Sequence, residues 1–194
     1  MEFFIKIDFF ANYITYYISN ILYIMETTDT VLFYSHNGYY GCFSNFYKSQ
    51  FKENDVTYCC SEQYLMKKKQ ELFDPENNAL SLKIMNSRTP AEIKKYGRSI
   101  CNFDQKIWDM NKFNIMVSGL RLKFSQNQNI RHILIATQNK NLFEASPHDK
   151  IWGTGFNVTD SLCKIMSGNT HDFGENYLGK ALEKVRNDII QHNK

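Results

Sequence analysis

A carboxylate and an amine stand seven residues apart at Glu62 and Lys69. Seven residues are roughly two turns of an α-helix, so both side chains share one face if this segment is helical. Glu62 would then lie in the first turn, where the positive end of the helix dipole favours its charge. The two can form a surface ion pair of little energetic value, or a general acid and base with an amine that contacts phosphate or forms an imine. Spacing alone favours the surface pair.

A second group of chemically capable residues lies in the stretch 144–155, where Asp149 precedes Trp152, Gly153 and Gly155. A tryptophan can stack on a flat ring, and glycines let backbone N–H groups approach a phosphate. The same residues also fit a turn around a core tryptophan. The sequence favours neither interpretation.

A third stretch, 38–46, reads Gly-Tyr-Tyr-Gly-Cys-Phe-Ser-Asn-Phe and contains Asn45. Its rings and amide could contact a purine-like or pyrimidine-like base. Aromatic residues more often belong to a core, so this stretch is weak evidence when taken alone.

Several familiar catalytic motifs are absent. The chain has no P-loop and no G-x-S-x-G nucleophile elbow. Gly153-Thr154-Gly155 is only G-x-G, because Val158 stands where a dinucleotide fingerprint has its third glycine. The triplet Lys67-Lys68-Lys69 has the ordinary interpretation of a solvated helix face.

Composition sets the class of protein. The 194 residues are 43% hydrophobic and 22% charged, which suits one globular domain with a real core. A formal net charge of +3 permits an anionic ligand but is too small for a polybasic nucleic-acid binder.

Cysteine and histidine spacing gives no sign of a metal site or a disulfide framework. Five cysteines are an odd number, no C-x-x-C pair occurs, and the five histidines form no H-E-x-x-H set. We therefore expect reduced thiols, a cytosolic protein, and no metal or cofactor. The cysteines are Cys42, Cys59, Cys60, Cys101 and Cys163.

Residues 1–30 form an extension rich in aromatic residues and isoleucine, ahead of a domain expected over 31–194. Polar residues such as Asp8 and Asn12 interrupt the apolar run well short of the roughly 18–20 residues that a membrane span needs. Apolar spacing from Ile14 onward predicts a helix packed on the domain. A non-native extension, with Met25 as the true start, is equally compatible.

The remaining pattern predicts a helix-rich α+β domain with a few short strands. Without β-α-β alternation, a doubly wound sheet is disfavoured. Strands are expected at 31–34, at 51, at 56–59 and at 142–145, with a turn at Asn54-Asp55 and a glycine-rich loop at 151–156. Helices are expected at 62–73 with Ser61 as the N-cap, at 79–85, at 90–96 after a Thr89 cap, at 112–124 and at 175–190. The apolar stripe of the last helix is expected at Leu178, Ala181, Leu182, Val185 and Ile189. Residues 130–136 fit either a helix or a strand.

Taken in order, these motifs resemble the NADAR family, also called YbiA-like N-glycosidases. The resemblance runs from about Leu32 to Arg186. The family commonly has a histidine where Gln63 stands. The matching strings are Gly-Cys-Phe-Ser-Asn-Phe, Ser-Glu-Gln-Tyr with Met66 and Lys69, Tyr96-Gly97-Arg98, Trp108, 123–127, 142–146, 149–155 and 176–182.

The resemblance implies hydrolysis of a ribosyl N-glycosidic bond, with no cofactor. Cleavage builds positive charge on the sugar, which a neighbouring carboxylate stabilises, and the leaving nitrogen and the water need an acid and a base. Glu62 and Asp149 are the expected carboxyls. Lys69 is expected to contact phosphate or to form an imine with ring-opened ribose.

The same resemblance implies a set of substrate-binding residues. An arginine would hold phosphate, two tryptophans would sandwich the base, an amide would read its edge, and two glycines would bring N–H groups to a phosphate. These are, in order, Arg98, Trp108 and Trp152, Asn45, and Gly153 and Gly155.

The expected partner is a small phosphoribosyl or ADP-ribosyl molecule. Family members are associated with early phosphoribosylamino-pyrimidine intermediates of riboflavin synthesis, and others with removal of ADP-ribose from guanine bases. Nucleic acid is expected only as a modified substrate, and no membrane is expected. A non-catalytic nucleotide-binding module is the competing class, but it has no need for Glu62. The sequence gives no oligomeric state.

Overall fold

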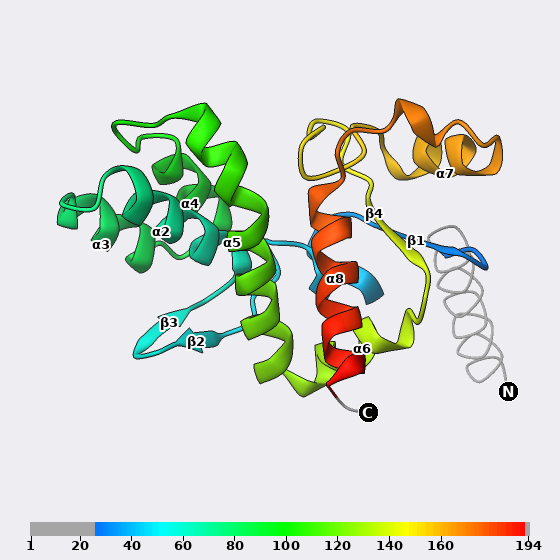
Figure 1. The fold of residues 1–194 in the computed structure, drawn as a ribbon, viewed down its shortest axis with the longest axis horizontal. Coiled ribbons are helices and arrows are strands. Elements are labelled where there is room, and N and C mark those ends of the chain that lie inside the picture. Colours follow the sequence, from blue (N-terminus) through cyan, green and yellow to red (C-terminus); the bar gives the residue numbers. More distant parts are fainter. Residues whose placement is uncertain (1–25, 193–194) are drawn as a thin grey trace, which may run out of the picture.

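The computed structural model describes residues 26–192 (Figure 1). The helix expected from Ile14 and the alternative start at Met25 lie outside the described residues. In the described part, helices dominate and four short strands form two separate two-stranded sheets, with no doubly wound sheet. The predicted fold class is therefore confirmed.

Two strands far apart in the chain pair at the centre of the fold. Strand β1 (Thr30–Phe33) runs parallel to β4 (Asn141–Glu144), with Phe33 opposite Glu144. Every residue of β1 is buried. Glu144, the last residue of β4, is thus anchored on the core strand.

A hairpin forms the second sheet. Strand β2 (Phe51–Glu53) runs antiparallel to β3 (Val56–Tyr58). Asn54 in the turn has a φ of 52°, a conformation that asparagine tolerates better than most residues. The strands and the Asn54-Asp55 turn match the sequence pattern.

Helix α2 (Ser61–Phe73) begins at Ser61, so the prediction that Ser61 is its N-cap is wrong. The N-cap residue is Cys60, which makes no side-chain cap hydrogen bond. The backbone N–H of Glu62 instead donates to the Asn45 carbonyl over 3.1 Å. A tertiary contact thus gives a hydrogen-bond partner to one of the free N–H groups at the start of α2. The local sequence gives no sign of this contact.

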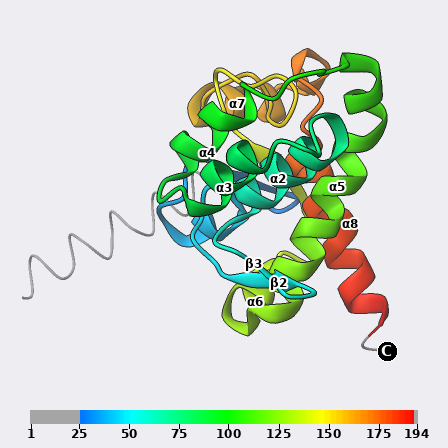
Figure 2. The same cartoon turned by 90° about the vertical axis from the view of Figure 1, so that its left-hand side faces the viewer.

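Helices α3 (Asn78–Asn86) and α4 (Pro90–Gly97) pack with α2 as one layer (Figure 2). The predicted Thr89 cap is confirmed: its hydroxyl accepts from the Glu92 N–H, and the Glu92 carboxylate accepts from the Thr89 N–H. This capping box fixes where α4 starts.

Helices α5 (Gln105–Gln126) and α8 (Tyr177–Gln191) lie side by side across the core (Figures 1 and 2). The α5 helix starts at Gln105 rather than at 112, because the Asp104 carboxylate caps it by accepting from Ile107. Helix α6 (Gln128–Ala136) settles the helix-or-strand ambiguity. The predicted apolar stripe of α8 is fully buried: Leu178, Ala181, Leu182, Val185 and Ile189.

Helix α7 (Val158–Met166) and two 3₁₀ turns, η1 (Tyr39–Phe43) and η2 (Thr170–Asp172), were not predicted. Between β4 and α7 runs the long loop 145–157. It is held by backbone bonds from Gly174 to Thr154 and from Glu175 to Lys150. These bonds tie the loop to the segment that leads into α8. None of the helices in residues 26–192 is long and apolar enough to cross a membrane.

Candidate active site

A cavity of about 420 Å³ opens where five segments meet. The segments are the turn after β1, the stretch after η1, the first turn of α2, the end of α4, and the loop after β4. Its lining residues are Tyr34, Ser35, His36, Ser44, Asn45, Phe46, Glu62, Lys94, Arg98, Glu144, Ser146, His148, Asp149 and Trp152.

Five of the nine predicted site residues line this one cavity: Asn45, Glu62, Arg98, Asp149 and Trp152. They come from positions more than a hundred residues apart in the chain. The structure therefore brings together a carboxyl pair, a guanidinium, an amide and an indole ring around one space.

Lys69 does not line the cavity. Its ammonium donates to the Gly97 carbonyl over 3.1 Å and lies 4.1 Å from the centre of the Phe103 ring. Glu62 is only 5% exposed and forms no salt bridge within the described residues, so a surface pair is also wrong. In this geometry Lys69 secures the end of α4 and adds a positive charge near Glu62.

Trp108 also lies apart from the cavity. It is 8% exposed and packs edge-on against Phe73 in the core, with ring centres 6.4 Å apart. It lies in the first turn of α5, where it takes part in the packing of α5 on α2. The two predicted tryptophans thus separate, and the cavity receives Trp152 alone.

The predicted glycines shape the loop and are not among the residues that line the cavity. A side chain at Gly153 would place its Cβ 2.6 Å from the Glu144 carbonyl oxygen. This contact is too short, and a backbone atom cannot move easily to relieve it. Gly155 has a φ of +80°, which L side chains rarely adopt. Both residues allow the loop to fold back on β4.

Asp149 organises the loop that carries Trp152. Its Oδ1 atom accepts from the N–H of Ile151 over 3.0 Å and from the N–H of Trp152 over 2.8 Å. The Trp152 ring packs edge-on against Tyr177, with ring centres 6.2 Å apart. The carboxylate therefore fixes the direction of the indole while its charge faces Glu62 and Glu144.

Burial and neighbouring charges set the protonation of Glu62. Desolvation raises its pKa to about 7, and the charge of Asp149 acts in the same direction. Lys94, Arg98 and Lys69 oppose this rise. A carboxyl with a pKa near neutrality can accept or release a proton at working pH.

Glu144 is a second carboxyl with a raised pKa, and it was not among the predicted site residues. Part of its surface opens to the cavity, yet surrounding protein atoms desolvate the carboxyl, which raises its pKa to about 8. Asp149 and Glu62 raise it further by repulsion. Glu62 and Glu144 are therefore two cavity carboxyls whose pKa values are both raised toward neutral pH.

Lys94 was also missed. It stands four residues before Arg98, so both side chains leave the same face of α4. In residues 26–192 neither cation forms a salt bridge. The i, i+4 spacing in the sequence was the available signal. Two cations without carboxylate partners are suited to an anionic ligand.

Asn45 is buried beside these groups with an unused acceptor. It is 7% exposed, and its side-chain oxygen has no hydrogen-bond partner. A buried amide oxygen without a partner is costly, so this atom is suited to accept from a bound molecule. No cluster of three His, Cys, Asp or Glu side chains among the described residues is arranged to hold a metal ion.

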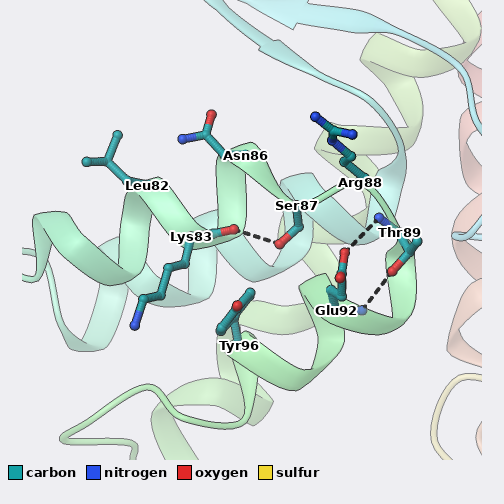
Figure 3. Close-up of a pocket in the computed structure, with 8 residues that line it drawn as sticks. All are labelled: Leu82, Lys83, Asn86, Ser87, Arg88, Thr89, Glu92 and Tyr96. Carbon is teal, nitrogen blue, oxygen red and sulfur yellow. Dashed lines mark hydrogen bonds between the residues drawn. The ribbon is translucent and has the colours of Figure 1, made fainter.

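A larger cavity of about 640 Å³ lies between α3 and α4 (Figure 3). Part of its polar lining is already paired: Ser87 donates to the Lys83 carbonyl over 2.6 Å, and Thr89 and Glu92 form the capping box. Glu92 is exposed and lies at its own helix end. This cavity offers no buried carboxyl and no orphaned polar atom, so the smaller cavity is the candidate site.

Comparisons with known proteins show the family of this chain. The family model of the NADAR domain matches residues 32–190. An N-glycosidase of Acanthamoeba polyphaga mimivirus is 38% identical over 86% of this chain and 100% of its own length. N-glycosidase YbiA of Escherichia coli is 30% identical over 83% and 89%.

The NMR structure of E. coli YbiA matches with a TM-score of 0.68 at 28% identity, covering 87% of this chain and 89% of that one. The chloroplastic riboflavin biosynthesis protein PYRR of maize (Zea mays) is 27% identical over 84% of this chain, a match to 26% of its own length. The family match over residues 32–190 thus lies within the described residues 26–192.

Proposed function

Because the chain belongs to the NADAR family and is a hydrolase of N-glycosyl compounds, we propose that its substrate is a phosphoribosylamino-pyrimidine of the kind formed early in riboflavin synthesis. The proposed products are ribose 5-phosphate and the free aminopyrimidine. The observation that carries this proposal is that two cations without salt-bridge partners in the described part of the chain and two carboxyls with raised pKa values line one cavity. The riboflavin-related name of the maize relative supports the choice of substrate.

The phosphate end of the substrate is assigned to α4. Arg98 is exposed at the cavity mouth and Lys94 is partly buried one helical turn earlier. A guanidinium binds phosphate through two parallel hydrogen bonds, and an ammonium adds a compact charge. Together they neutralise a ribose 5-phosphate dianion and direct the sugar toward Glu62.

The heterocycle is assigned to the aromatic part of the cavity lining. Trp152 offers an aromatic face on which a flat ring can stack, whereas the Phe46 ring lies 5.9 Å from the Lys94 ammonium. The unpartnered Asn45 oxygen accepts a hydrogen from an exocyclic amine of the pyrimidine. This pairing discriminates against a ring that lacks the amine, because the buried oxygen would then stay unsatisfied.

The two carboxyls divide the proton transfers between them. Glu62, ionised, takes a proton from the attacking water and stabilises the positive charge that develops on the ribose. Glu144, protonated, donates its proton to the leaving nitrogen as the C1′–N bond breaks. Water supplies the new C1′–OH bond, so the sum is hydrolysis. Asp149 keeps the Glu144 proton in place by raising its pKa.

The reaction is expected to have a bell-shaped pH dependence. Activity rises as Glu62 loses its proton around a pKa of about 7, and it falls as Glu144 loses its proton around a pKa of about 8. The optimum therefore lies between these two pKa values. Initial rates of ribose 5-phosphate release from pH 5 to pH 10 test this. A flat profile between pH 6 and pH 9 would contradict the assignment.

Product release tests the proposed function. The protein is incubated with the phosphoribosylamino-pyrimidine and, separately, with ADP-ribosyl-guanosine, each beside a Glu62→Gln control. Release of ribose 5-phosphate from the first compound, lost in the control, is the expected result. Release of ADP-ribose from the second compound alone would assign a different substrate. Tight binding of either compound without cleavage would favour a binding module.

A further inference from the structure

Two adjacent cysteines, Cys59 and Cys60, lie just before the helix turn that carries the proposed catalytic glutamate, and they play no part in the proposed chemistry. The Sγ atoms of Cys59 and Cys60 lie 3.8 Å apart. Cys60 is completely buried, whereas Cys59, the first residue after strand β3, is partly exposed. Glu62 follows two residues after Cys60, in the first turn of α2.

The two thiols differ in reactivity. The contact with Cys60 lowers the pKa of Cys59 to about 7, against the effect of its partial burial, and Lys48 contributes a further lowering. The thiolate is the nucleophilic form, so Cys59 is reactive at neutral pH. The same contact, with burial, raises the pKa of Cys60. An exposed attacking thiol therefore stands beside a protected second thiol.

We propose that Cys59 and Cys60 form a peroxide-reactive dithiol, and that its oxidation to a disulfide lowers the N-glycosidase activity. The second half of this inference rests on the proposed function. The Cys59 thiolate attacks the peroxide, takes one oxygen to become a sulfenic acid, and releases water after protonation. Cys60 then attacks the Cys59 sulfur, the S–S bond forms and a second water leaves. Two thiols lose two electrons, and hydrogen peroxide accepts them.

Bond formation must disturb the start of α2. A disulfide joins its sulfurs at about 2.0 Å, so two atoms now 3.8 Å apart must close by almost half that distance. The backbone of Cys59 is firmly held on both sides: its carbonyl accepts from the Ser49 N–H over 3.0 Å, and its N–H donates to the Gln63 side chain over 2.8 Å. The rearrangement is therefore passed on to the residues around it.

A backbone movement at Cys60 is expected to reach Glu62 and Asn45 through hydrogen bonds. The Cys60 carbonyl accepts from the Tyr64 N–H, and the Glu62 N–H donates to the Asn45 carbonyl. A shift of this helix turn displaces the carboxyl and the amide that face the cavity. Misplacement of a catalytic group by about 1 Å can cost on the order of 100-fold in rate.

The linkage is also expected to be reversible. Neighbouring Cα atoms on a trans peptide are about 3.8 Å apart, closer than the about 4.4–6.8 Å usual for disulfides. A bond formed under such constraint is readily reduced, as in regulatory rather than structural disulfides.

The test uses the full chain carrying Cys101→Ser and Cys163→Ser, which removes the two exposed thiols. Cys42 stays, because burial raises its thiol pKa to about 11 and keeps it unreactive. After brief hydrogen peroxide treatment, we expect two titratable thiols fewer in the denatured protein and a mass lower by two hydrogen atoms. Ribose 5-phosphate release should fall by about tenfold or more and recover after dithiothreitol.

Matched variants identify the residues responsible. In the same background, Cys59→Ser and Cys60→Ala should each keep their activity through peroxide treatment and should form no intramolecular disulfide. Loss of two thiols without loss of activity would overturn the claim that the disulfide lowers N-glycosidase activity. Inactivation that persists in Cys59→Ser, or stable addition of oxygen in place of the disulfide, would overturn the dithiol itself.

Thiol titration and mass do not depend on the substrate, so they separate this inference from the proposed function. If the reduced protein releases no ribose 5-phosphate, the proposed function fails while the disulfide is still judged by mass. The coupling is then judged by calorimetric binding of ribose 5-phosphate before and after oxidation, which we expect to weaken. Unchanged binding would overturn the coupling.

Discussion

Replacing Glu62 with glutamine is expected to lower kcat by about 100- to 10,000-fold, the range typical of a lost general base. Glutamine keeps the size of the side chain but cannot take a proton from water or offset positive charge on the ribose. Glu62 is the only predicted site carboxyl that is also deeply buried, at 5% exposure. The measurement is single-turnover release of ribose 5-phosphate at saturating substrate.

The same substitution should leave the fold intact or make it more stable. The pKa of Glu62 rises from 4.5 to about 7 on folding, so the folded state opposes its ionisation. Above pH 4.5 the unfolded chain carries the charge at no cost, and folding must take up a proton or bury the charge. Removing the carboxyl removes that penalty at neutral pH. Thermal unfolding of Glu62→Gln at pH 7 should therefore give a Tm no lower than that of the wild type.

Glu71→Gln is the matched control, because Glu71 lies on the same helix and faces solvent. It pairs with Lys67 and Lys68 at the surface, where such pairs contribute little. We expect wild-type kcat from this variant. A kcat for Glu62→Gln within a factor of about three of wild type would remove Glu62 from the mechanism.

Replacing Arg98 with alanine is expected to raise KM for the phosphoribosyl substrate by about 10- to 100-fold, and Lys94→Ala by a similar factor. Each variant lacks one charge-assisted hydrogen bond to the phosphate. That bond is present in both the ground state and the transition state. For Arg98, kcat should change little, because the loss of uniform binding raises KM alone. Lys94 also lowers the pKa values of Glu62 and Glu144, so its removal should shift the pH optimum upward.

Lys95→Ala is the control for both variants. Lys95 is the neighbour of Lys94 on α4, but it is exposed and does not line the cavity. Its KM should equal that of the wild type at physiological salt. An equal rise in KM for all three variants would mean that general positive charge, rather than a defined phosphate site, attracts the substrate. Steady-state kinetics at two salt concentrations separates these outcomes.

The features that the sequence determined are local ones. Asn54 in the hairpin turn, the Thr89 capping box and the buried stripe of α8 each depend on contacts within one or two turns. The family motifs also identified Glu62, Asp149, Arg98, Asn45 and Trp152 as candidates before any geometry was available. Helix α7 and the early start of α5 were missed, because short caps at Asn157 and Asp104 were not weighed as helix starts.

Only the tertiary structure decided which candidates share a site. Trp108 and Trp152 are the same residue type, yet packing against Phe73 places one in the core while the loop fixed by Asp149 brings the other to the cavity. Lys69 is held by the Gly97 carbonyl, and Lys94 lines the cavity instead. The parallel pairing of β1 with β4 puts Glu144 near Glu62, although 82 positions separate them in the sequence. Desolvation and charge repulsion depend on that enclosure, so the raised pKa values that suit the two carboxyls to proton transfer exist only in the folded chain.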